Sequence, residues 1–214
     1  MSVAVKICGL NAPDAVAAAV EGGASYVGFV FYKRSPRYVT PEQAASLCAA
    51  VPSGIQRVGL FVDAPEEEIR AVLAAAPIDM LQLHGKEASD WIVDAKLRLK
   101  RPIMKAVAIS GAADVLRADR YDEVADMLLF DAKPPSTAEA LPGGNGLAFD
   151  WRLLAGRRWR RPWMLSGGLN PENVAEAVRL TGAPAVDVSS GVETAPGRKD
   201  PAKIRAFLEA ARAL

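Results

Sequence analysis

The sequence repeats one pattern eight times, in which a short apolar run is followed by a polar stretch and then by an amphipathic segment. The apolar runs predict strands at Ala4–Cys8, Tyr26–Phe31, Gln56–Val62, Met80–His84, Ile103–Val107, Met127–Asp131, Trp163–Ser166 and Ala185–Ser189. Helices are expected near residues 13–22, 41–50, 65–75, 87–97, 111–118, 150–155, 171–181 and 201–213. Strands that alternate with helices form parallel sheets, and eight such units exceed the usual number in an open doubly wound sheet. The pattern therefore predicts an α/β fold in which residues 1–214 form a single (β/α)8 TIM barrel.

Three expected helices begin with a capping side chain followed by proline at the first helical position, as in Thr40-Pro41, Asn170-Pro171 and Asp200-Pro201. Gln43 lies three residues after Thr40, which completes a capping box. One long connection, Ala132–Phe149, interrupts the regular spacing, and long connections in compact domains are usually functional or mobile.

Charge and composition narrow the classes of partner. The chain has 26 basic and 25 acidic residues, so no global field attracts nucleic acid or a membrane surface. No apolar run is long enough to span a bilayer, and the N-terminus does not resemble a signal peptide. One histidine and two cysteines are too few for a histidine-rich metal site or a disulfide framework. We expect a cytoplasmic protein with no metal, no nucleic-acid or membrane partner and no obligate protein partner.

A basic segment with interleaved tryptophans, Gly156–Trp163, has the composition of a nucleic-acid patch. It precedes the seventh expected strand, so a barrel places it at the face opposite the usual site. We therefore do not expect it to bind nucleic acid.

Several strands alternate polar with apolar residues, and successive side chains point to opposite faces of a sheet. A parallel sheet covered by helices has no face in water, so we expect the apolar set to meet the helices and the polar set to line the barrel. For the third strand this places Val58, Leu60 and Val62 toward the helices. The polar residues expected around the C-terminal mouth of the barrel, where such folds place their site, are Lys6, Cys8, His84, Asp131, Asp187 and Ser189.

Two of these residues are candidates for proton transfer. Cys8 ends its strand two residues after Lys6, and a nearby cation favours the thiolate, the form that can act as a base. Asp131 follows an apolar run, and an apolar wall would favour the protonated form that a general acid needs. The alternatives are a buried small hydrophobe for Cys8, the reading that fits Cys48, and a cap or an ion pair with Lys133 for Asp131.

Two glycine-containing loops follow the last two strands: Ser166-Gly167-Gly168 and Ser189-Ser190-Gly191. In barrels a phosphate commonly binds between these loops, because glycines allow close approach and helix N-termini supply N–H donors. The alternative is that both are only tight turns. Arg37 lies in a basic loop after the second strand, where its fork would suit a carboxylate; a solvated loop is the alternative there.

An ordered set of segments spans the chain from the first strand to the last helix: Lys6-Ile7-Cys8-Gly9, Gly28-Phe29-Val30-Phe31, Ser35-Pro36-Arg37-Tyr38, Val58-Gly59-Leu60-Phe61, Leu81-Gln82-Leu83-His84-Gly85, Ser166-Gly167-Gly168-Leu169, and Asp187–Glu193 followed by Pro196-Gly197 and Lys199-Asp200. Together they resemble the phosphoribosylanthranilate isomerase family of tryptophan biosynthesis. Any one of these segments alone would not be specific.

The resemblance implies an Amadori rearrangement of N-(5-phosphoribosyl)anthranilate, a small phosphosugar substrate, without metal or redox cofactor. It implies Cys8 as general base, Asp131 as general acid and Arg37 opposite the anthranilate carboxylate. His84 and Asp187 match family positions at the mouth and are expected to bind substrate. The residues that match the family's phosphate loops are Gly167, Gly168, Ser189, Ser190 and Gly191.

Two other classes of protein share part of this pattern. Indole-glycerol-phosphate synthases and histidine-pathway isomerases have similar phosphate loops, but the former act through lysine and glutamate and the latter through paired aspartates. A first strand that ends in Cys8 argues against both. A non-catalytic phosphate-binding barrel would keep the glycine loops and need neither Cys8 nor Asp131.

Overall fold

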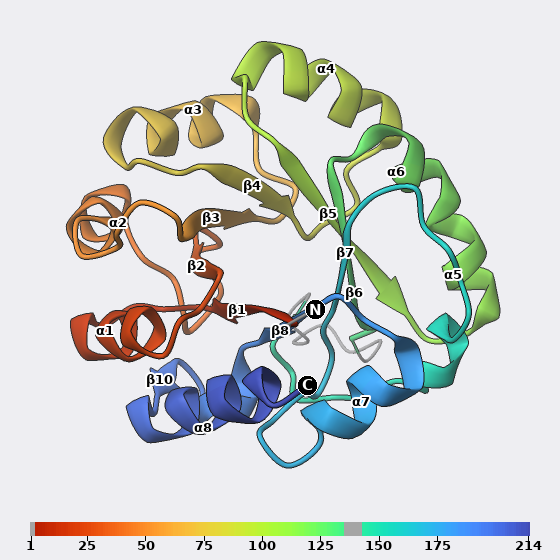
Figure 1. Ribbon diagram of the computed structural model, residues 1–214. Helices are drawn as coiled ribbons and strands as arrows, with labels where there is room; N and C mark the ends of the chain where they lie inside the picture. The colour runs from red at the N-terminus through yellow and green to blue at the C-terminus, as the bar shows by residue number, and fades with distance from the viewer. Residues whose placement is uncertain (1–2, 135–142) are drawn as a thin grey trace.

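The computed structural model describes residues 3–134 and 143–214. Eight strands form a closed barrel in the order β1-β2-β3-β4-β5-β6-β7-β8, and every neighbouring pair, including β8 with β1, is parallel. Figure 1 shows the helices as a ring outside the strands. The prediction of an α/β TIM barrel is confirmed.

The barrel strands are β1 Ala4–Cys8, β2 Tyr26–Val30, β3 Gln56–Phe61, β4 Met80–Leu83, β5 Ile103–Ile109, β6 Met127–Ala132, β7 Trp163–Leu165 and β8 Ala185–Val188. The α-helices are α1 Pro13–Glu21, α2 Pro41–Cys48, α3 Glu66–Ala75, α4 Ser89–Leu99, α5 Ala112–Arg117, α6 Asp119–Val124, α7 Val174–Thr181 and α8 Pro201–Arg212. Two 3₁₀ helices, η1 Trp151–Leu154 and η2 Ser190–Val192, and a small hairpin, β9 Glu193–Ala195 with β10 Arg198–Lys199, complete the described elements.

All eight strands expected from the sequence are present, with ends shifted by a residue or two. The helices differ more. The fifth crossover contains a second helix, α6, and the expected helix at 150–155 is the 3₁₀ helix η1. The hairpin of β9 and β10 follows β8 and was not predicted. Of the long connection after β6, residues 135–142 lie outside the described part of the chain.

The predicted helix starts have mixed outcomes. Thr40 and Gln43 form the reciprocal capping box of α2, and Asp200 caps α8. The helix start predicted after Asn170 is wrong by one turn. The Asn170 side chain accepts hydrogen bonds from the backbone N–H groups of Glu172 and Asn173, at 3.0 and 2.9 Å. These bonds close a turn, and α7 begins only at Val174.

The interior of the barrel has two zones. Toward the N-terminal ends of the strands it is filled by an apolar cluster, comprising Met104, Ala106, Met127, Leu129, Met164 and Ala185. Toward the C-terminal ends the inward side chains become polar. Lys6, Gln82 and Asp187 are buried there, while their strand neighbours Ile7 and Leu81 pack against the helices. The expected alternation is therefore confirmed for β1, β4 and β8.

The expectation for the third strand is wrong. Leu60 packs with Cys8 and Val30 inside the barrel, and Leu60 and Val62 line the pocket at its mouth. Phe61 instead points outward, where its ring stacks on Phe31 with centroids 5.2 Å apart. Both faces of β3 are apolar, so polarity could not reveal its orientation. Barrel interiors are commonly filled by branched aliphatic side chains, which suit the inward positions of β3.

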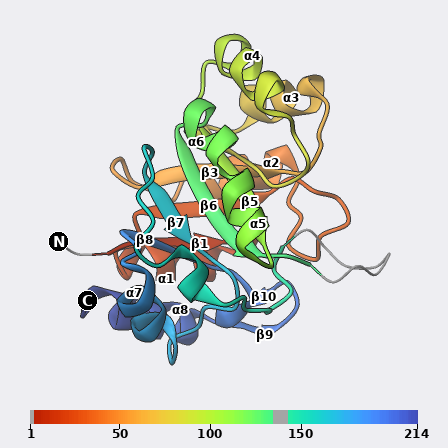
Figure 2. The ribbon, with the colours of Figure 1, turned by 90° about the vertical axis from the view of Figure 1, so that its right-hand side faces the viewer.

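The outer face of the barrel is covered by helices and by the segment before β7. Figure 2 shows α5 and α6 lying over β5 and β6. Trp159, from the basic segment 156–163, packs against Phe130 with ring centroids 4.7 Å apart, and Trp163 contacts the same ring at 5.7 Å.

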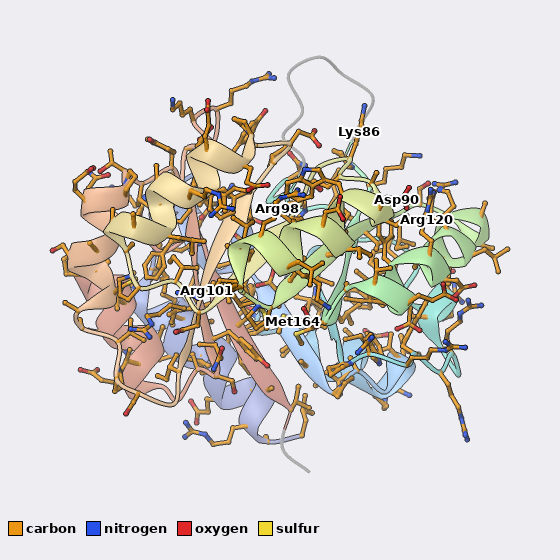
Figure 3. All side chains as sticks on the ribbon, turned by 90° about the horizontal axis from the view of Figure 1, so that it is seen from above. Lys86, Asp90, Arg98, Arg101, Arg120 and Met164 are labelled. Atoms are coloured by element: carbon orange, nitrogen blue, oxygen red, sulfur yellow. The ribbon has the colours of Figure 1, made fainter. Side chains whose placement is uncertain are left out.

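In Figure 3 the labelled Arg98 and Asp90 lie on α4, where both are exposed, whereas Met164 is buried inside the barrel.

This packing predicts a large contribution of Phe130 to stability. Phe130→Ala removes a fully buried ring between two tryptophans, so we expect the free energy of unfolding to fall by about 3–5 kcal/mol. Urea denaturation followed by tryptophan fluorescence measures this change. Leu97→Ala is the matched control, because Leu97 is 74% exposed and its removal should change stability by less than about 0.5 kcal/mol. Equal small effects in both variants would contradict the packing argument.

Candidate active site

One pocket of about 750 Å³ opens at the C-terminal ends of the barrel strands. Its walls include nearly all of the residues predicted from the sequence: Cys8, Arg37, His84, Asp131, Gly167, Gly168, Asp187, Ser189 and Ser190. Lys6 and Gly191 do not line it. Five of the six polar residues expected at the mouth, all but Lys6, are therefore brought together from parts of the chain that are far apart in the sequence.

Cys8 lies at the end of β1, beside a buried ion pair. Lys6 Nζ is 2.9 Å from Asp187 Oδ1, and the Lys6 side chain is fully buried. Ser166 Oγ donates to the other Asp187 oxygen at 3.1 Å. The thiol and the ammonium both lie next to Gly28. A Cβ placed on Gly28 would lie 3.1 Å from Cys8 Sγ and 3.2 Å from Lys6 Nζ.

Burial and charge act against each other at this position. Burial lowers the pKa of Lys6, but the charges of Asp187 and Cys8 outweigh it and raise that pKa to about 12. Burial raises the pKa of Cys8, and the Lys6 ammonium opposes this rise without cancelling it. Lys6 therefore remains a cation at neutral pH, and the Cys8 thiol is mainly protonated.

Asp131, at the end of β6, faces His84 across the pocket. Asp131 Oδ2 lies 3.2 Å from His84 Nε2, and Asp131 Oδ1 accepts the backbone N–H of Ala132 at 2.8 Å. The second nitrogen of the ring, Nδ1, is 2.9 Å from Gln82 Nε2. Asp131 thus has polar partners at both oxygens rather than the apolar wall expected from the sequence. Lys133 is exposed and is not among the partners described for Asp131.

Arg37 is held by a buried carboxylate that the sequence did not reveal. Its Nε and Nη2 each donate to one oxygen of Glu193 at 2.7 Å, and Nη2 also donates to the carbonyl oxygen of Gly144 at 3.1 Å. A guanidinium has five N–H donors, so these contacts leave the two donors on Nη1 without a described contact. The buried ion pair fixes the arginine fork at the pocket wall.

Lys199 joins the same cluster. Its Nζ donates to Glu193 Oε1 and to the carbonyl oxygen of Ser189, both at 2.8 Å. Burial lowers the pKa of Lys199 to about 8, although the Glu193 carboxylate opposes the shift. Burial raises the pKa of Glu193, but Arg37 and Lys199 more than offset this, so the net shift is downward. The cluster ties the β9–β10 hairpin to the loop after β8, and so positions Ser189.

The two glycine loops lie side by side at one end of the pocket. Gly167, Gly168, Ser189 and Ser190 line it, next to the short 3₁₀ helix η2. Gly191 does not line the pocket and lies where the two loops meet. A Cβ on this residue would lie 1.9 Å from the carbonyl oxygen of Leu169, so only glycine allows the two loops to meet this closely.

Residues 143–147 also line the pocket, on the side where His84 and Asp131 lie. A Cβ on Gly143 would lie 2.8 Å from His84 Nε2 and 3.0 Å from Asp131 Oδ2. This backbone therefore lies directly against the His84–Asp131 pair. The length of the connection indicated a functional or mobile segment, but nothing in the sequence specified which side chains it would contact.

Sequence reasoning assigned no role to Gln82, Glu193 or Lys199. Gln82 was detectable, because it lies two residues before His84 and shares its inward face. Glu193 and Lys199 belong to the segments that carried the family resemblance, yet their pairing with Arg37 depends on which loops meet in space.

Within residues 3–134 and 143–214, no group of three or more His, Cys, Asp or Glu side chains is placed to hold a metal ion. Among the helices in those same ranges, none is long and apolar enough to cross a membrane.

A family model and highly similar relatives indicate one family. The family model described as N-(5'phosphoribosyl)anthranilate (PRA) isomerase matches residues 5–210. The N-(5'-phosphoribosyl)anthranilate isomerase of Rhodospirillum centenum is 59% identical over 214 residues, covering 100% of both chains. The crystal structure of phosphoribosyl anthranilate isomerase from Thermotoga maritima is 40% identical, with a TM-score of 0.88, and the match covers 99% of this chain and 100% of that one. A crystal structure of such an isomerase in complex with reduced 1-(o-carboxyphenylamino)-1-deoxyribulose 5-phosphate is 39% identical, with a TM-score of 0.85 over 99% and 100% of the two chains.

The raised pKa of Cys8 predicts slow alkylation at neutral pH. The thiolate is the reactive form, and a higher pKa means less thiolate at any given pH. In a Cys48→Ala background, which removes the other thiol, we expect the iodoacetamide rate of the free enzyme to be still rising at pH 9. A Cys8→Ala, Cys48→Ala double variant supplies the blank. A rate that reaches its plateau below pH 7 would contradict the effect of burial.

Proposed function

The chain belongs to the N-(5'-phosphoribosyl)anthranilate isomerase family, as its motifs predicted, and we propose how its pocket converts N-(5'-phosphoribosyl)anthranilate into 1-(2-carboxyphenylamino)-1-deoxyribulose 5-phosphate. This isomerisation is a step of tryptophan biosynthesis. The observation that carries the proposal is that Cys8 and Asp131, from β1 and β6, line one pocket together with both glycine loops.

The pocket offers complementary groups for each part of the substrate. The phosphate binds between the loops of Gly167, Gly168 and Ser190, whose backbone N–H groups suit an anion. The anthranilate carboxylate binds the Nη1 donors of Arg37, while Glu193 holds the guanidinium in place. The sugar then lies between these two anchors, in reach of the acid and the base.

The first step opens the sugar ring. Asp131 donates a proton to the ring oxygen, the bond between C1 and that oxygen breaks, and the nitrogen lone pair forms the C1=N bond of an iminium ion. The Asp131 carboxylate that remains is stabilised by the N–H of Ala132. His84 lies on its other oxygen.

In the second step the Cys8 thiolate takes the proton from C2. The electrons of that C–H bond form a C1=C2 double bond and neutralise the iminium, which gives an enol-amine. Tautomerisation of the enol to the ketone completes the rearrangement, with no net gain or loss of atoms. Neither step needs an external reductant or oxidant.

The raised pKa of Cys8 in the free enzyme is compatible with this role. The thiol lies beside the Lys6 ammonium, and the iminium formed in the first step adds a second positive charge close to it. Both charges favour the thiolate. The base is therefore activated mainly when the intermediate that requires it has formed.

The two unpaired thiols, Cys8 and Cys48, suit a reducing compartment. Together with membership of a biosynthetic family, this supports a cytoplasmic location.

We expect separate Cys8→Ala and Asp131→Ala variants to lose turnover while they keep ligand binding. Each removes one proton-transfer group, and such groups contribute about 10²–10⁴-fold to rates. The loss of anthranilate-adduct fluorescence measures turnover, and titration with the reduced product analogue measures binding. Cys48→Ala is the matched control, since Cys48 lies on α2 outside the pocket. Turnover near the wild-type rate in both site variants would remove the acid–base assignment.

The rate should depend on pH in two directions. It needs Cys8 ionised and Asp131 protonated, so kcat/KM is expected to rise and then fall as the pH increases. Initial rates across the pH range test this, with solvent viscosity varied to identify conditions in which product release limits the rate. A flat profile that is also insensitive to viscosity would contradict the proposed pair.

A further inference from the structure

His84 is the one histidine of the chain, and its two ring nitrogens have different partners. It lies one residue past the end of β4 and two residues after Gln82, so both side chains point into the barrel. Gln82 is fully buried, and its Nε2 lies 2.9 Å from His84 Nδ1. An amide nitrogen can only donate a hydrogen bond, so Nδ1 must present its lone pair and cannot carry a proton.

The orientation of the amide follows from its other atom. Among the described residues, Gln82 Oε1 has no hydrogen-bond partner. Reversing the amide would leave a buried NH₂ group, with two donors, unpaired in its place. An unpaired carbonyl oxygen is the less costly of the two. The observed orientation is therefore the favoured one, and it makes Gln82 a donor to the histidine ring.

A neutral imidazole carries one proton, which must then be on Nε2. That nitrogen lies 3.2 Å from Asp131 Oδ2, so the ring donates one hydrogen bond to the carboxyl group. Asp131 is the charged side chain described in contact with His84. The other titratable groups with defined places around the same pocket are Cys8 on β1, Tyr32 and Arg37 after β2, and Asp187 on β8.

The charge of the His84 ring determines whether Asp131 can hold a proton. An imidazolium next to Asp131 would hold it as a carboxylate, because an adjacent positive charge favours the ionised form. A neutral ring donates a hydrogen bond but leaves Asp131 able to take up the proton that it must deliver. We infer that Gln82 is a positioning residue that keeps His84 neutral, with its proton on Nε2, so that Asp131 can serve as the acid. The last part of this inference rests on the proposed function, whereas the state of the ring does not.

Nitrogen NMR tests the ring directly, since a single histidine gives an unambiguous long-range ¹H–¹⁵N spectrum. In the wild-type enzyme at pH 7.5 we expect Nδ1 to resonate as an unprotonated nitrogen and Nε2 as a protonated one. A spectrum with Nδ1 protonated, alone or together with Nε2, would overturn the inference. This measurement needs no variant and no substrate.

Gln82→Glu supplies the second arm. It replaces the donor with a carboxylate that accepts a proton from Nδ1, so both nitrogens should appear protonated, and kcat/KM should fall by about 10²-fold or more through loss of the acid. Gln82→Met removes the donor without adding an acceptor and should have the smaller effect on both readouts. Gln43→Glu is the matched control, because it adds the same charge in the capping box of α2 and should leave the histidine spectrum unchanged.

The two readouts separate the inference from the proposed function. If Gln82→Glu protonates both nitrogens but retains wild-type turnover, the assignment of the ring stands and the acid role of Asp131 fails. If Gln82→Glu leaves Nδ1 unprotonated, the amide does not control the ring and the inference fails.

Discussion

Closure of the sheet is the constraint on which the rest of this structure depends. Each of the eight strands has a parallel neighbour on both sides, so every side chain faces either the helices or the enclosed interior. A charged group that faces inward cannot reach bulk water through a sheet edge and must find a partner within the barrel. Lys6 and Asp187, which come from the adjacent strands β1 and β8, meet this requirement together.

The same constraint explains which parts of the site were predictable. Where polar and apolar residues alternate, as around Lys6 and His84, the sequence indicated which side chains point into the barrel and which residues lie at its mouth. Where both faces are apolar, as in β3, polarity carried no information and Leu60 was assigned to the wrong side. The Asn170 turn failed for a local reason, because its side chain bonds nearby N–H groups before the helix has begun.

The remaining gaps come from contacts between loops. The pairing of Arg37 with Glu193 joins residues 156 positions apart, and it depends on how the hairpin after β8 packs. No periodicity in either segment encodes that meeting. Gln82 is a different case, since its spacing from His84 was visible. What the sequence lacked was the orientation of the amide toward the ring, which determines the direction of the hydrogen bond.

The methionine-rich floor of the barrel has a kinetic consequence. Met104, Met127 and Met164 close the interior below the polar zone, so the chamber is blind-ended. The product must leave the chamber through the same opening by which the next substrate molecule enters. The two molecules cannot occupy the chamber together. Release of one molecule must therefore precede entry of the next.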